Sequence, residues 1–135
     1  MNIIKLLMAA KSEEVLGSEE YDSVFINNGF ETYTIDGLDI TSAIDSFLGG
    51  KCYDNIALDV GKTYKITFDY VYNSGTNPTY RVASNADLNI NAVLNEQLVG
   101  TGTYTFYSLG QAYHGFDSAF STSFEVYNLS VKEVL

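Results

Sequence analysis

The stretch from Gly61 to Asn73, GKTYKITFDYVYN, constrains the fold of this chain more than any other feature. Large apolar side chains occupy every second position from Tyr64 to Tyr72, and polar side chains separate them as far as Asp69. A period of two places alternate side chains on opposite faces of a β-strand. We therefore predict a half-buried antiparallel strand with one face against a core.

Weaker alternating segments recur at intervals of about ten residues, separated by residues that favour turns. In residues 79–84, for example, Tyr80 and Val82 alternate with Arg81 and Ala83. An irregular or short helical segment is predicted at Ser42–Leu48. The predicted strands are a pair within residues 23–34, followed by 53–60, 61–73, 79–84, 88–94, 100–108, 112–116 and 123–134.

In the last of these segments the alternation changes phase. Phe124 and Val126 are apolar at even positions, whereas Leu129 and Val131 are apolar at odd positions. One extra residue near Tyr127-Asn128 would produce this change, which predicts a β-bulge.

These patterns predict an all-β fold, an antiparallel β-sandwich of the jelly-roll type, preceded by a short N-terminal helix. The 135 residues suit one domain. We divide the chain into an N-terminal helical anchor segment, residues 1–18, and a jelly-roll domain, residues 19–135. The helix is predicted from Asn2 to about Leu16 and ends at Gly17. Lys5 interrupts its apolar run, so an uncleaved amino terminus is expected.

The apolar stripe of this helix is the candidate assembly surface. It packs on its own domain or anchors the protein in an assembly, and the sequence favours neither alternative. Its members are Ile3, Ile4, Leu7 and Met8.

The charge of the chain excludes several partners. Asp and Glu number 17 against 7 Lys and Arg, which gives a formal net charge of −10. Such a chain repels nucleic acid, whose binding requires Lys and Arg at the phosphates. It also repels anionic membrane surfaces, and no apolar run is long enough to span a bilayer. We expect a soluble protein.

No constellation of catalytic residues is recognisable. Cys52 and His114 are the only residues of their types. Cys52 is interpreted as a buried small hydrophobic residue, and His114 as a packed or surface residue. The acidic residues between Asp36 and Asp59 lie in turn-like or alternating contexts that favour local hydrogen bonding. We therefore predict a non-enzymatic protein without a cofactor.

Five segments resemble a known family. They are NNGFE at Asn27–Glu31, GLDITSAI at Gly37–Ile44, GKTYKITFDY at Gly61–Tyr70, GTGTYTFY at Gly100–Tyr107 and SFEVYNLSVKEV at Ser123–Val134. They resemble the carbohydrate-binding-module-like jelly rolls of bacteriophage virion proteins, including capsid decoration proteins, head fibres and tail fibres. Related galactose-binding-like modules occur on secreted bacterial glycosidases.

The resemblance implies a structural protein on the phage particle surface. It would dock through its N-terminal segment onto other virion proteins, form a homo-oligomer, with a trimer expected, and adhere to host glycans. The alternative is a free-standing carbohydrate-binding module of a bacterial surface or secreted system.

The resemblance also indicates candidate binding residues. In sugar-binding relatives a calcium ion often lies beside a turn that matches Asn27–Glu31, so Glu31 is a weak calcium candidate. The chain has no Trp, and Tyr would have to provide the aromatic platform for a sugar ring. The candidate glycan contacts are Tyr107, Tyr113 and Tyr127.

Overall fold

The computed structural model describes residues 14–47, 49–55 and 58–135. Within these ranges every regular element is a β-strand. The strands are β1 (Leu16–Glu19), β2 (Ile26–Asn28), β3 (Thr32–Asp36), β4 (Asp39–Asp45), β5 (Gly50–Asp54), β6 (Thr63–Gly75), β7 (Thr79–Ala83), β8 (Leu94–Gln97), β9 (Gly102–Leu109), β10 (Tyr113–Ser118) and β11 (Thr122–Val134).

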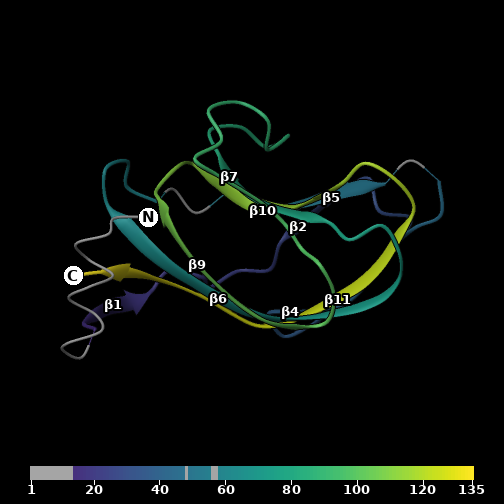
Figure 1. Ribbon diagram of the computed structural model, residues 1–135, viewed down its shortest axis with the longest axis horizontal. Helices are drawn as coiled ribbons and strands as arrows, with labels where there is room; N and C mark the ends of the chain where they lie inside the picture. The colour runs from purple at the N-terminus through teal and green to yellow at the C-terminus, as the bar shows by residue number, and fades with distance from the viewer. Residues whose placement is uncertain (1–13, 48, 56–57) are drawn as a thin grey trace.

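The strands form two sheets packed face to face (Figure 1). The first sheet has the order β3-β4-β11-β6-β9, and β1 pairs with the carboxyl-terminal end of β11. The second sheet has the order β2-β5-β10-β7-β8. Neighbouring strands are antiparallel in both sheets. The predicted antiparallel β-sandwich is confirmed.

The core lies between the two sheets and is rich in aromatic rings. As predicted, every second side chain from Tyr64 to Tyr70 on β6 is buried, whereas Tyr72, the last of the alternating series, is 38% exposed. At its centre, Phe68 meets Phe116 of the second sheet edge-on, with ring centroids 5.2 Å apart. Such aromatic pairs add about 0.5–1.5 kcal/mol each to the free energy gained by burial. Cys52 is a buried core residue, as predicted, and burial raises the pKa of its thiol to about 12.

The predicted β-bulge in β11 is confirmed at Asn128. Tyr127 pairs with Asp69 and Ser130 pairs with Thr67, so three steps along β11 oppose two steps along β6. Asn128 adopts a positive φ of 56°, and its side-chain amide donates to Asp69 Oδ2 at 2.9 Å. A local hydrogen bond of this kind favours Asn in the left-handed region.

The prediction of an irregular or short helical segment at Ser42–Leu48 is wrong for residues 42–45, which belong to β4. Ile40 and Ala43 are both buried although they are three residues apart. The pairing of β4 with β11 shifts between them, which indicates a bulge. This bulge breaks the period of two, so the sequence pattern does not resemble a strand.

The predicted N-terminal helix lies almost entirely outside the described residues, together with the candidate assembly residues Ile3, Ile4, Leu7 and Met8. At its end the structure differs from the prediction, because Leu16 and Gly17 begin β1. Leu16 pairs with Val134 of β11, and this pairing requires an extended backbone. The part of the chain that the structure describes has no helix able to cross a membrane. The boundary between residues 18 and 19 stays a prediction.

Candidate functional site

The outward-facing side of the second sheet gathers aromatic and charged side chains. On β5, β10 and β7 the inward positions carry core residues such as Cys52, Phe116 and Tyr80. Alternation along these strands therefore places the intervening side chains on the outer surface. We call this surface the second-sheet face, and it consists of Lys51, Tyr53, Thr79, Arg81, Tyr113 and Asp117.

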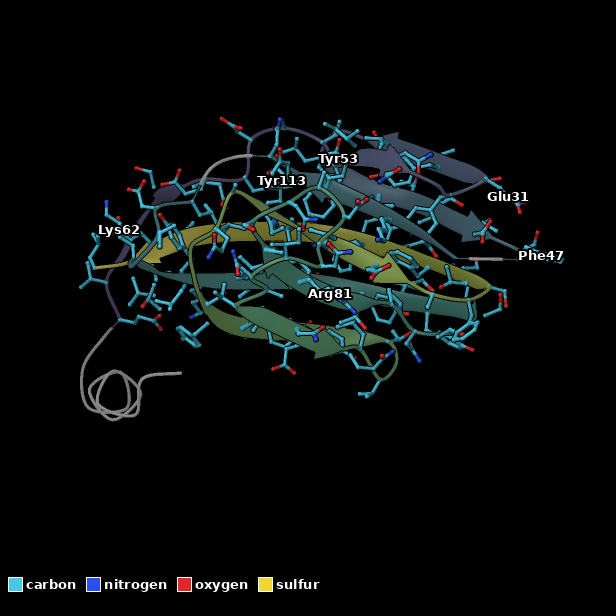
Figure 2. All side chains as sticks on the ribbon, turned by 90° about the horizontal axis from the view of Figure 1, so that it is seen from above. Glu31, Phe47, Tyr53, Lys62, Arg81 and Tyr113 are labelled. Carbon is cyan, nitrogen blue, oxygen red and sulfur yellow. The ribbon has the colours of Figure 1, made fainter. Side chains whose placement is uncertain are left out.

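Two tyrosines from neighbouring strands form the aromatic part of this face. Tyr53 of β5 and Tyr113 of β10 meet edge-on, with ring centroids 5.7 Å apart and planes at 69°. Both are partly exposed, and Figure 2 shows them side by side on this surface. The exposed part of these rings can contact the apolar side of a ligand.

Gly115 lies between the tyrosines and the charged part of the face. It pairs with Tyr53 on one side and with Arg81 on the other. A Cβ atom at this position would lie 2.0 Å from the carbonyl oxygen of Cys52. Glycine therefore allows β10 and β5 to approach closely, and it leaves the middle of the face without a side chain.

The charged part of the face is held in place by mutual contacts. Arg81 Nη2 lies 3.7 Å from Asp117 Oδ2, and Arg81 Nη1 donates to the carbonyl oxygen of Leu88 at 3.3 Å. Lys51 Nζ donates to the carbonyl oxygen of Asp87 at 3.0 Å. These groups supply both donors and acceptors for a ligand rich in hydroxyls.

A shallow polar depression of about 460 Å³ adjoins this charged part. It lies where β5 begins and β10 ends, beside the carboxyl end of β2. Its lining residues are Asn28, Gly29, Gly49, Gly50, Lys51, Asp87, Asp117, Ser118 and Ala119.

A buried polar network lies directly beneath the face. His114 Nδ1 shares a 2.7 Å hydrogen bond with the Tyr80 hydroxyl, and His114 Nε2 lies 3.2 Å from Asp54 Oδ2. Burial keeps the pKa of Tyr80 well above its usual value. The imidazole of His114 thus links Tyr80 of β7 to Asp54 of β5. Asp54 follows Tyr53, Tyr80 precedes Arg81, and His114 follows Tyr113 in the sequence. The network therefore fixes the three strands that carry these face residues.

The three predicted glycan contacts do not lie together. Tyr113 belongs to the second-sheet face, whereas Tyr107 and Tyr127 lie on the outer surface of the first sheet. The Tyr107 hydroxyl donates to Glu14 Oε2 at 2.9 Å, and burial is the main cause of its raised pKa. The Tyr127 hydroxyl donates to Glu125 Oε1, which is the main cause of its raised pKa.

Glu31, the weak calcium candidate, accepts hydrogen bonds from the Ser46 hydroxyl at 2.9 and 3.1 Å. Residues 14–47, 49–55 and 58–135 contain no group of three or more His, Cys, Asp or Glu side chains that could hold a metal ion. Calcium normally takes six to eight oxygen ligands. Calcium binding at Glu31 stays a prediction.

Sequence reasoning missed Lys51, Tyr53, Arg81, Asp87 and Asp117 as site residues. The sequence GKCYD at Gly50–Asp54 alternates small or acidic inward residues with Lys51 and Tyr53. The predicted strand began at residue 53, so the alternation of Lys51 with Gly50 and Cys52 was not recognised as part of it.

No protein-family model and no curated protein matches the sequence. Solved structures share the fold at low identity. A structure described as CBM4 is 15% identical over 78% of this chain and 77% of its own, with a TM-score of 0.62. The N-terminal cellulose-binding domain of Cellulomonas fimi β-1,4-glucanase C is 13% identical over 88% and 96%, with a TM-score of 0.57.

A third similar structure is a mutant of the carbohydrate-binding module CBM29-2 in complex with mannohexaose. It is 11% identical over 90% of this chain and 93% of its own, with a TM-score of 0.55. At these identities the similarity establishes the fold of carbohydrate-binding modules for this chain.

Proposed function

We propose that this protein is a non-catalytic glycan-binding module that binds its ligand on the second-sheet face. The partly exposed pair of Tyr53 and Tyr113, beside the charged groups of Lys51, Arg81 and Asp117, is the observation that carries the proposal. Aromatic rings contact the C–H side of a sugar, and charged side chains hydrogen-bond its hydroxyls.

The structural similarities support this function. Two of the similar structures are complexes of CBM29-2 mutants, one with mannohexaose and one with cellulohexaose. They favour the free-standing carbohydrate-binding module over the virion protein among the two alternatives drawn from the sequence. The virion location, the contacts with other virion proteins and the trimer stay predictions.

The position of His114 supports a non-catalytic role. Tyr80, His114 and Asp54 form an arrangement that resembles a proton relay, but His114 is 1% exposed and Tyr80 is fully buried. A catalytic base must come within hydrogen-bond reach of its substrate. This network therefore acts on the stability and geometry of the sheet.

Replacing Tyr113 with alanine is expected to weaken glycan binding about 30-fold, because loss of a central aromatic contact costs about 2 kcal/mol. The measurement is isothermal titration calorimetry with mannohexaose, cellohexaose and the neutral oligosaccharide that gives the strongest signal on a glycan array. Tyr127→Ala is the matched control, since Tyr127 lies on the outer surface of the first sheet.

The control variant should bind as the native protein does. The opposite pattern, in which Tyr127→Ala loses binding and Tyr113→Ala keeps it, would move the site to the first sheet. Absence of any glycan ligand for the native protein would refute the proposed function itself.

A further inference from the structure

The loop between β7 and β8, residues 84–93, crosses the second-sheet face. It leaves β7 after Ala83, which pairs with Tyr113, and it returns where Val93 N donates to the carbonyl oxygen of Val82 at 2.8 Å. Between these points Asp87 reaches Lys51 of β5, whose Nζ donates to its carbonyl oxygen. Because β10 lies between β7 and β5, the loop passes over β10.

Several contacts fix the loop on the face. Leu88 is fully buried although it lies outside the core between the sheets, and its carbonyl oxygen accepts from Arg81. Within the loop, Asn85 Oδ1 accepts from the backbone N–H groups of Asn89 and Ile90, each at 3.0 Å. A buried apolar anchor and internal hydrogen bonds make the loop a fixed wall.

This wall divides the face into two parts. The aromatic pair, Tyr53 and Tyr113, lies at the end of the face where the loop begins. The polar depression lies at the other end, bounded by Asp87 and Lys51. A long glycan lying across β10 would have to pass over the loop, whereas the end of a chain can enter the depression from the open side.

The charges of the depression indicate which sugars it takes. Two carboxylates, Asp87 and Asp117, line it beside a single ammonium group, Lys51. Arg81 compensates the charge of Asp117, so Asp87 and Lys51 leave the depression close to neutral, while the whole chain carries a formal net charge of −10. Carboxylates accept hydrogen bonds from sugar hydroxyls and repel acidic sugars.

We propose that the depression binds the terminal unit of a neutral glycan, so that the protein recognises chain ends in preference to internal segments. This inference rests on the proposed function and specifies its ligand. The loop and the bridge between Lys51 and Asp87 exclude a continuous polymer, and the net negative charge of the chain disfavours acidic sugars.

Stoichiometry distinguishes chain ends from internal segments. The native protein is titrated by calorimetry with mannohexaose or cellohexaose, whichever binds, and with a soluble polymer of the same sugar at equal mass. The number of chain ends per gram is inversely proportional to chain length. The number of binding sites per gram should therefore be lower for the polymer than for the hexasaccharide by the same factor. Equal or greater binding to the polymer per gram would overturn the inference while leaving glycan binding intact.

A variant tests the depression itself. Asp87→Ala removes a carboxylate but keeps the backbone carbonyl that accepts from Lys51, and it should weaken binding of the hexasaccharide about tenfold. Asp22→Ala, at an exposed acidic residue outside the depression, should leave affinity unchanged. Thermal unfolding confirms that both variants fold.

Unchanged affinity in Asp87→Ala, or stronger binding of acidic than of neutral glycans on an array, would overturn the inference. In either case the effect of Tyr113→Ala would still support glycan binding on this face. Failure of every glycan to bind the native protein would instead refute the proposed function, and the inference with it.

Discussion

Replacing His114 with alanine is expected to lower the free energy of unfolding by about 3 kcal/mol, because it leaves buried polar groups without a hydrogen-bond partner and opens a cavity. The imidazole is 1% exposed and bridges Tyr80 and Asp54 across three strands. Its loss leaves a buried carboxylate without its imidazole partner and opens a cavity beside Phe25, whose ring centroid lies 5.1 Å from that of His114.

Urea denaturation followed by far-UV circular dichroism measures this loss. Tyr113→Ala is the matched control, because Tyr113 precedes His114 on β10 but is partly exposed on the opposite face. Its loss of stability should be about 1 kcal/mol. A loss below about 1 kcal/mol for His114→Ala would mean that Asp54 is stable without the imidazole, contrary to the role assigned to the network.

Replacing Gly115 with alanine is expected to lower the free energy of unfolding by about 3 kcal/mol, at the upper end of typical overpacking effects. The new Cβ would lie 2.0 Å from the carbonyl oxygen of Cys52 and 2.9 Å from the Cα of Tyr53. These are backbone atoms, so no side-chain rotation can relieve the clash. β10 and β5 would have to separate, which would also displace the two tyrosines of the face.

Gly102→Ala on β9 is the matched control, because a Cβ at Gly102 would meet no atom within 4 Å. Thermal unfolding of both variants should show a large decrease in Tm for Gly115→Ala and almost none for Gly102→Ala. Equal Tm values for the two variants would contradict the close approach of β10 and β5.

Strands could be predicted from the sequence where apolar and polar residues alternate within a single segment. The period of two in β6 and its change of phase in β11 are properties of single segments, and both predictions are confirmed. In β4 a bulge between Ile40 and Ala43 interrupts the pattern, so the strand resembled an irregular or helical segment. A bulge therefore hides a strand from sequence-based prediction when no change in the phase of the apolar positions marks it.

The candidate site was harder to predict because it depends on pairing between distant segments. Tyr113 was a candidate from its sequence, but Tyr53 is 60 residues earlier and joins it only because β5 pairs with β10. The loop that crosses the face is likewise invisible in the sequence, since Lys51 and Asp87 are 36 residues apart. Alternation assigns side chains to faces, but it does not determine which strands are neighbours.

The most direct test of glycan binding on the second-sheet face is a titration of isotopically labelled protein with the bound oligosaccharide, followed by amide chemical shifts in NMR spectra. We expect the largest shifts to cluster on β5, β10 and the loop of residues 84–93, around Tyr53, Tyr113 and Asp87. Shifts confined to β9 and β11, around Tyr107 and Tyr127, would contradict this expectation and place the ligand on the first sheet.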